Sequence, residues 1–368
     1  MSKDINSRLS DLKSRRRGIS SIYALDSINS ATASVLKEKF EQRADGEWSK
    51  YALGAMEEVD PTYTKNSIAE GERVKSQISN RINTNVTFDY QGSVPLNVHI
   101  KGVSDIDILV LLKDFVTIDR HGAKANSVKY STWTGPTAVV LLTTLRSDLE
   151  ALLKESFPKV NIDVSGDKAI GMSGGSLSRK VDIVPSHWHD SAAYQLSESK
   201  IDREVKILEQ KKALTFLNRP FLHIDKINTK DSETRGGTKK IIRMLKNLKA
   251  DSENADLILV NSYEIAGLVY HFENSVIDVP IYNELALVAA TQQQLNIMIN
   301  NKAWAMSLDT PDGIRKILES EEKFNSLRTL HNEVSELVKN LAIELSTEAW
   351  LTSEQEINTL KKSYIRGV

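Results

Sequence analysis

The chain has 368 residues, a formal net charge of −1 and no cysteine. Disulfides and thiolate zinc sites are therefore excluded, and the near-zero net charge argues against a protein that coats nucleic acid nonspecifically. No apolar run approaches the roughly 20 residues that a membrane span requires, and the polar start of the chain does not resemble a signal peptide. We expect a cytoplasmic protein of one large or two ordinary domains, with no membrane partner.

The first 85 residues predict polar helices. Residues 20–40 contain neither Pro nor Gly, and residues 47–58 form a second, shorter helical pattern. Residues 64–82 place Val74 and Ile78 four positions apart, which is the spacing of one helical face. No chemistry is legible in these segments, so we expect them to be scaffold helices behind a sheet.

Residues 86–190 predict a mixed sheet. Short apolar runs, separated by Gly and Ser, occur at residues 86–90, 107–112, 160–164 and 181–184. A helical pattern covers residues 137–157, and from about Ser197 the sequence predicts helices to its end. The expected architecture is α+β: a catalytic domain with N-terminal helices over residues 1–196, followed by a helical nucleotide-binding domain over residues 197–368.

The segment QGSVPLNVHIKGVSDIDILVLLK, residues 91–113, carries the clearest chemical signal. Successive side chains of a strand alternate between faces, so Asp105 and Asp107 project from the same side. Two carboxylates on one face repel unless a cation lies between them, and oxygen ligands favour Mg²⁺ or Mn²⁺. Upstream, Gly92 and Ser93 offer backbone N–H groups and a hydroxyl to a phosphate. The segment predicts a metal site beside a phosphate site.

A third carboxylate follows in the run RKVDIVP, where apolar residues flank Asp182. A charged side chain in such a place needs a partner. If this strand pairs beside Asp105 and Asp107, three carboxylates converge and could hold two metal ions. Nearby, His187 and His189 have the spacing of a metal pair, but a surface loop is the expected alternative. The run GMSGGS at residues 171–176 is expected to be a hairpin rather than a phosphate loop.

The helical half contains a basic helix and a second helix start. Thr238 is the expected N-cap of a helix over residues 239–249, whose polar face carries Lys246. The second helix is expected to begin near Ser262 and Tyr263. For each residue a structural reading stays open: Lys246 as a solvated lysine, Ser262 as a helix cap, and Tyr263 as a core aromatic.

These motifs in this order resemble the nucleotidyltransferase superfamily of DNA polymerase β. Within it, the resemblance is to the CD-NTases, the bacterial relatives of cyclic GMP–AMP synthase, and to oligoadenylate synthase. It rests on GS at Gly92-Ser93, on DID and VDIVP, and on the later runs IRMLKNLK and NSYEIAGLVYHF. It spans roughly residues 89–272. Asn97-Val98 departs from the glycine-threonine pair that many relatives carry after GS.

The resemblance implies a role for each of these residues. Asp105, Asp107 and Asp182 match the metal triad, which holds two Mg²⁺ or Mn²⁺ ions, and the polymerase β-like sheet is followed by an oligoadenylate synthase-like helical domain. The other matches are phosphate-holding Gly92 and Ser93, triphosphate-contacting Lys246, phosphate-contacting Ser262 and base-stacking Tyr263. The zinc-binding thumb of the animal sensor has no counterpart, so activation by double-stranded DNA is not expected.

The leading functional prediction is an enzyme that makes a cyclic or short linear oligonucleotide messenger from nucleoside triphosphates. Relatives signal phage infection to effector proteins, so the resemblance implies antiviral defence, with an effector or a regulatory protein as partner. Two alternatives stay open. One is template-independent transfer of nucleotides to a tRNA, DNA or protein acceptor, which the near-neutral charge disfavours. The other is an inactive nucleotide-binding protein, which three retained aspartates disfavour.

Overall fold

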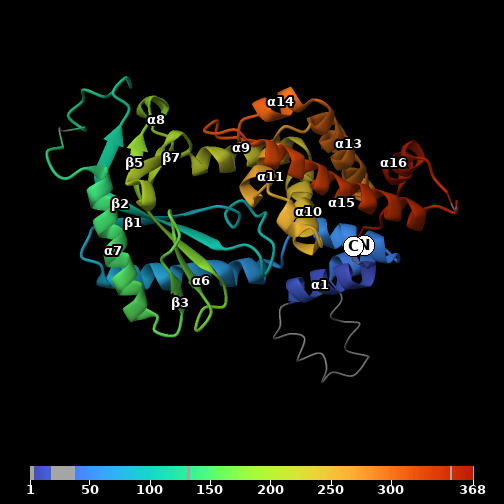
Figure 1. Ribbon diagram of the computed structural model, residues 1–368, viewed down its shortest axis with the longest axis horizontal. Coiled ribbons are helices and arrows are strands. Elements are labelled where there is room, and N and C mark those ends of the chain that lie inside the picture. The colour runs from blue at the N-terminus through green and yellow to red at the C-terminus, as the bar shows by residue number, and fades with distance from the viewer. Residues whose placement is uncertain (1–3, 18–37, 131–132, 349, 368) are drawn as a thin grey trace. The chain divides into compact units, whose positions relative to one another are not determined.

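The computed structural model describes residues 4–17, 38–130, 133–348 and 350–367 (Figure 1). They form two compact units. The sheet unit contains residues 60–96 and 104–226, and the helical unit contains residues 1–59, 97–103 and 227–368. This division differs from the boundary expected at residues 196 and 197, because the N-terminal helices group with the C-terminal ones. Of the helix expected over residues 20–40, positions 20–37 lie outside the described residues.

The sheet unit is built on one seven-stranded mixed sheet. Its strands are β1 (Val86–Gln91), β2 (Ile106–Ile118), β3 (Asn161–Asp163), β4 (Ile170–Ser173), β5 (Val181–Asp190), β6 (Glu204–Glu209) and β7 (Leu214–Asn218). The order is β1-β2-β5-β4-β3, with β6 paired to β5 and β7 paired to β6. Only β2 and β5 are parallel, and the other pairs are antiparallel. The mixed sheet is confirmed, but helix to the end from Ser197 is wrong, since β6 and β7 lie beyond that residue.

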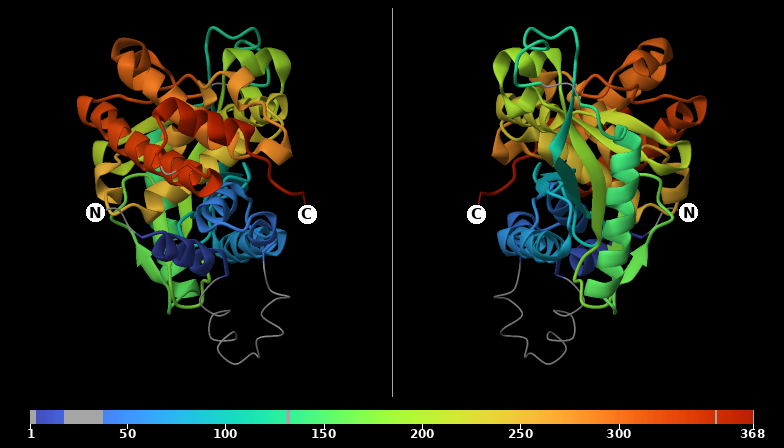
Figure 2. Two further views of the ribbon diagram at one scale, coloured as in Figure 1. Left: turned by 90° about the vertical axis from the view of Figure 1, so that its right-hand side faces the viewer. Right: turned by 90° about the vertical axis from the view of Figure 1, so that its left-hand side faces the viewer.

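Two long helices cover one face of this sheet (Figure 1). The helices of the sheet unit are α6 (Pro61–Arg81), α7 (Ala138–Ser156) and α8 (Ala192–Ser197), with 3-10 turns η1 (Lys200–Asp202) and η2 (Gln210–Lys212). Val74 and Ile78 of α6 and Leu145 of α7 share a buried cluster with Ile108 and Val110 of β2. The right-hand view of Figure 2 shows α7 lying along the strands. Because successive side chains of a strand point to opposite faces, Asp107 of β2 points away from α6 and α7.

The helical unit gathers elements from both ends of the chain. They are α1 (Ile5–Arg17), α4 (Lys39–Arg43), α5 (Glu47–Met56), α10 (Gly237–Asp251), η3 (Ala255–Leu257), α11 (Ser262–Tyr270), α12 (Asn274–Ile277), η4 (Ile281–Asn283), α13 (Ala286–Asn300), α14 (Lys302–Ser307), α15 (Glu321–Leu345) and α16 (Ser353–Lys362). The division between the units falls within α9 (Pro220–Glu233). The expected N-cap Thr238 is wrong: Gly236 precedes α10 with a positive φ of 84°, and Thr238 is buried against Thr234. Among the described residues, no helix is long and apolar enough to cross a membrane.

A buried arginine of α7 fixes the loop between β3 and β4. Arg146 is 1% exposed, and its Nη2 donates to the carbonyl oxygens of Val164 at 3.1 Å and Gly166 at 2.8 Å. Its Nε donates to Glu150 at 2.8 Å, one helical turn away. Carbonyl groups in a loop lack the partners that a helix or sheet supplies. The guanidinium therefore substitutes for backbone pairing and holds the start of β4 in place.

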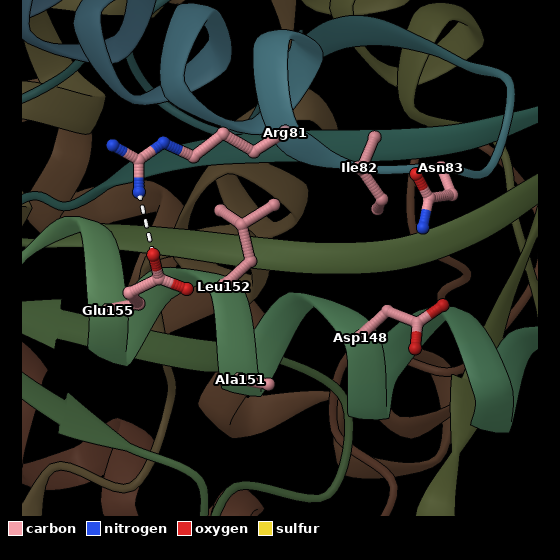
Figure 3. Close-up of a pocket in the computed structure, with 7 residues that line it drawn as sticks. All are labelled: Arg81, Ile82, Asn83, Asp148, Ala151, Leu152 and Glu155. Atoms are coloured by element: carbon pink, nitrogen blue, oxygen red, sulfur yellow. Dashed lines mark hydrogen bonds and ion pairs between the residues drawn. The ribbon is translucent and has the colours of Figure 1, made fainter.

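We expect Arg146→Ala to lower the free energy of unfolding of the sheet unit by about 3 kcal/mol or more, because it leaves a cavity and buried groups without donors. A melting curve measures this. Arg81→Ala is the matched control: Arg81 is 46% exposed, and its 3.4 Å pair with Glu155 is on the surface (Figure 3). Such a pair contributes about 0–1 kcal/mol. Equal melting points for the two variants would contradict the structural role of Arg146.

Candidate active site

Two of the carboxylates predicted to bind metal, Asp107 and Asp182, lie side by side on the face of the sheet opposite to α6 and α7. Asp107 of β2 is the direct backbone partner of Asp182 of β5 in the parallel ladder. Paired residues on neighbouring strands point to the same face. Ile106 and Ile108 alternate with Asp107 and lie in the core under α6 and α7, so both carboxylates project from the other face. Backbone register alone therefore brings together two acidic residues that are 75 positions apart in the chain.

Asp105, the third carboxylate of the predicted triad, lies close enough to Asp182 to affect its pKa. Asp105 directly precedes β2, one residue before its start at Ile106. Burial, and after it the negative charge of Asp105, raise the pKa of Asp182 to about 6. Burial and like charge both disfavour the ionised form of a carboxyl group. A cation beside these groups would reverse both effects, so the electrostatics favour a bound positive charge.

The Gly-Ser pair is held against the same carboxylates. Gly92 follows β1, whose last residue, Gln91, is the backbone partner of Asp107. Its φ of 77° lies in the left-handed region that glycine tolerates. A Cβ atom at this position would lie 2.1 Å from Oδ2 of Asp107. Only glycine lets the loop at Ser93 pass this close to the carboxylate, and the result is a cradle of backbone beside Asp107.

The row of paired positions continues across the sheet. Beyond Asp182 the partner on β4 is Gly171, and the partner of Gly171 on β3 is Asp163. At the other end, Oε1 of Gln91 accepts a hydrogen bond from Nδ2 of Asn218 at 3.1 Å. Sequence reasoning missed Gln91, Gly171 and Asp163 as neighbours of the carboxylates. These residues become neighbours through the register of paired strands. Register cannot be predicted from any one segment of the sequence.

The donor set fits magnesium or manganese. Three carboxylates supply only oxygen, the ligand that these hard cations prefer, and Gly92 lets the backbone lie directly against one of them, Asp107. No three His, Asp or Glu side chains in the described ranges stand at the spacing of a formed metal cluster. Strand register places the backbone positions of Asp107 and Asp182 side by side.

Lys246 is in the helical unit, on α10. Its side chain is buried at 4% exposure, and Nζ donates to the carbonyl oxygen of Val98 at 2.8 Å. One turn earlier, Arg243 donates to the carbonyl oxygens of Met56 at 2.7 Å and Asn97 at 2.8 Å. The solvated-lysine alternative is therefore wrong. The polar face of α10 instead binds the backbone of residues 97 and 98, the pair that departs from the family pattern.

Ser262 and Tyr263 open α11, as expected. The cap is Asn261, whose side chain accepts from the backbone N–H groups of Tyr263 and Glu264, while Glu264 binds the N–H of Asn261 in return. The alternative of Ser262 as the cap is therefore wrong. Ser262 is exposed in the first turn, where backbone N–H groups and the helix dipole favour an anion. Tyr263 is half-buried, and its hydroxyl donates to Asp312 at 2.7 Å.

The two histidines contradict the expectation of a surface loop. His187 and His189 lie within β5, and His187 is fully buried beside the ring of Phe115. Burial lowers the pKa of each imidazole to about 4, so both are neutral at pH 7. Nδ1 of His189 is 2.8 Å from the hydroxyl of Thr117. His187 is a core residue and His189 is partly buried, on a strand that is longer than its apolar start, Val181–Val184, indicates.

A pocket of about 250 Å³ in the sheet unit is unrelated to the carboxylates (Figure 3). It lies between the end of α6 and α7, and the residues that line it are Arg81, Ile82, Asn83, Asp148, Ala151, Leu152 and Glu155. Both helices cover the face of the sheet that carries Ile108, opposite to Asp107. None of the predicted site residues lines this pocket.

Comparison with known proteins identifies the family of this chain. Residues 225–342 match the family described as cGAS/DncV-like nucleotidyltransferase C-terminal helical domain. The cyclic dinucleotide synthase CdnE of Yersinia aleksiciae is 34% identical over 93% of this chain and 93% of its own length. This chain belongs to the CD-NTase family. A c-di-GMP synthase of a Lachnospiraceae bacterium is 32% identical over 73% of this chain and 79% of its own length.

A solved structure of a relative is similar to this chain over nearly its whole length. The structure of a STING-associated CdnE c-di-GMP synthase from Capnocytophaga granulosa is 29% identical and aligns with a TM-score of 0.72. The alignment covers 93% of this CD-NTase and 100% of that chain. The α+β fold with a C-terminal helical domain is confirmed, and the enzyme is a nucleotidyltransferase.

We expect Gly92→Ala to abolish turnover of this CD-NTase, because the new methyl group would displace the Asp107 carboxylate and strain a left-handed residue. Gly174→Ala is the matched control: its φ is 70° and a Cβ atom there meets nothing within 4 Å. The two variants share the backbone strain, and only the first touches the carboxylate. Nucleotide turnover and melting points measure both effects. Equal activity in the two variants would contradict the cradle.

Proposed function

We propose that this CD-NTase joins two nucleoside triphosphates into a cyclic dinucleotide and releases pyrophosphate at each bond. The observation that carries the proposal is the in-register pair of Asp107 and Asp182 beside the Gly92 cradle. The relatives support the product class, because they are named as cyclic dinucleotide and c-di-GMP synthases. We further propose GTP as the preferred substrate and c-di-GMP as the product.

The triad would hold two Mg²⁺ or Mn²⁺ ions through Asp105, Asp107 and Asp182. Such ions, when bound, make a hydroxyl more acidic and stabilise the charge of departing pyrophosphate. The oxygen of a ribose hydroxyl attacks the α-phosphorus of a triphosphate, and the bond from that phosphorus to the bridging oxygen of pyrophosphate breaks. Asp182, whose pKa is raised by burial, would accept the proton of the attacking hydroxyl. A second round of the same step closes the ring.

The remaining predicted residues would bind and orient the nucleotide. Gly92 and Ser93 would donate backbone N–H groups and a hydroxyl to the phosphates beside Asp107. In the helical unit, we propose that Lys246 neutralises phosphate charge, that Ser262 contacts phosphate and that Tyr263 stacks on a base. Most of the rate acceleration would then come from positioning and fixed charge.

The product would act as a signal. The solved Capnocytophaga granulosa relative is named as STING-associated. We propose that the cyclic dinucleotide of this CD-NTase binds an effector protein of that kind, and that the pair serves antiviral defence in the cytoplasm. On this proposal the partner recognises the nucleotide product rather than a surface of the enzyme.

Product analysis tests the proposal. The enzyme is incubated with each nucleoside triphosphate singly and with all four together, with Mg²⁺ or Mn²⁺, and the products are treated with phosphatase before mass spectrometry. We expect a phosphatase-resistant cyclic dinucleotide, formed from GTP alone. Long ladders would indicate a polymerase, and label on a macromolecule would indicate a transferase. The absence of any product would support the inactive-protein alternative.

A double substitution tests the carboxylates. Asp105→Ala with Asp107→Ala is expected to abolish product formation while the melting point stays the same or rises, since it removes like charges from one face of the sheet. Asp148→Ala is the control, because this exposed carboxylate lies on α7 over the opposite face (Figure 3). It should retain full activity. Product formation by the double variant at the control's rate would exclude the metal role.

A further inference from the structure

The loop between α14 and α15 is a hairpin with a tight end. Asp309 and Lys316 form an isolated antiparallel bridge. Inside it, the backbone N–H of Thr310 donates to the carbonyl oxygen of Arg315 at 2.8 Å, and the N–H of Gly313 donates back to Thr310 at 2.7 Å. Gly313 has a φ of 72°, the left-handed conformation that lets the chain reverse here. The hairpin is therefore a defined structure rather than a loose connection.

This hairpin packs against α11. A Cβ atom at Gly267 would lie 3.0 Å from Cδ1 of Ile317 and 3.6 Å from Cδ of Pro311. Tyr263 is four residues before Gly267, so both lie on one face of the helix. Ile317 is fully buried. The absence of a side chain at Gly267 lets the hairpin approach the face of α11 that carries the proposed base-stacking tyrosine.

At the tip of the hairpin, Asp312 binds the hydroxyl of Tyr263. Oδ2 of Asp312 accepts from the tyrosine at 2.7 Å, and Oδ1 accepts from the hydroxyl of Thr310 and from the backbone N–H of Ile314. Asp312 is 1% exposed, so these bonds are shielded from water. Burial and the Asp312 charge raise the pKa of Tyr263. The hydroxyl stays protonated and donates to a carboxylate that cannot turn away.

Arg315, from the same hairpin, lies over the tyrosine ring. Its guanidinium carbon is 4.8 Å from the ring centroid. A cation over an aromatic face is attracted by the negative charge of that face. Arg315 therefore covers one side of the ring while Asp312 holds its end.

We propose that Asp312 and Arg315 are positioning residues that hold the ring of Tyr263 ready for a purine base of the substrate. This inference rests on the proposed base-stacking role of Tyr263. Asp312 contacts the tyrosine and not the nucleotide. Its effect is to remove the rotational freedom that the ring would otherwise lose on binding, which makes stacking more favourable. The hairpin thereby becomes part of the nucleotide site.

The test is the kinetics of Asp312→Asn with GTP. The amide preserves the shape of the side chain but removes the charge that holds the hydroxyl. We expect KM to rise about two- to tenfold, the effect of losing one hydrogen bond. The kcat should stay within about twofold, because stacking acts equally on the ground state and the transition state. A merely structural role would lower the melting point and leave KM unchanged below it, and that result would overturn the proposal.

Asp309→Asn is the matched control, because it changes the same residue type in the same hairpin. Asp309 is half exposed, and its carboxylate pairs with Lys316 at 2.8 Å on the surface. The control should keep the KM and kcat of the unmodified enzyme. If it raises KM as much as Asp312→Asn does, the effect belongs to the hairpin as a whole and the assignment to Asp312 is wrong.

A double-mutant cycle separates the two residues. If Asp312 acts through the hydroxyl of Tyr263, then Tyr263→Phe and Asp312→Asn should each raise KM, and the double variant should be no worse than either one. Additive effects on KM would overturn the proposal that Asp312 acts through Tyr263.

The variant Tyr263→Ala separates the inference from the function on which it rests. An unchanged KM in Tyr263→Ala removes the stacking role itself, whereas a raised KM there with an unchanged KM in Asp312→Asn removes only the positioning role.

Discussion

The parallel pairing of β2 with β5 is the interaction on which the site depends. It sets Asp107 directly beside Asp182, although like charges on one sheet face repel and burial penalises the charged form of Asp182. The apolar side chains that alternate with them compensate, since Ile106, Ile108 and Ile183 are all fully buried under α6 and α7. The core thus holds two carboxylates in a place that is unfavourable without a cation. This is the condition under which a metal ion binds tightly to oxygen ligands.

Buried polar side chains organise the segments around this sheet and around α10. Arg146 binds the loop before β4, and Arg243 and Lys246 bind the carbonyl groups of residues 56, 97 and 98. In each case a long cation reaches backbone that has no partner in a helix or strand. The proposed phosphate-binding lysine is therefore also a structural residue. Substitution at Lys246 would affect stability together with nucleotide binding.

The glycines show how closely backbone and function are linked. Gly92 lets the loop at Ser93 approach the Asp107 carboxylate, and Gly267 lets the hairpin between α14 and α15 approach α11. Each is needed because another group occupies the volume of its missing side chain. Gly267 lies within α11, so close approach alone explains it. At Gly92 the positive φ of 77° is a second reason for glycine.

The sequence by itself determined the mixed sheet, the helix α7, the spacing that puts two carboxylates on one strand face, and the start of α11. Local rules suffice for these, because strand alternation, helical periodicity and short motifs are readable within about twenty residues. Only the tertiary structure decided the rest. His187 is buried and His189 partly buried because β5 continues past its apolar start, and Asp312 meets Tyr263 through packing 49 positions away. Register and long-range packing join residues that no local pattern connects, and they depend on the whole core rather than on any one segment.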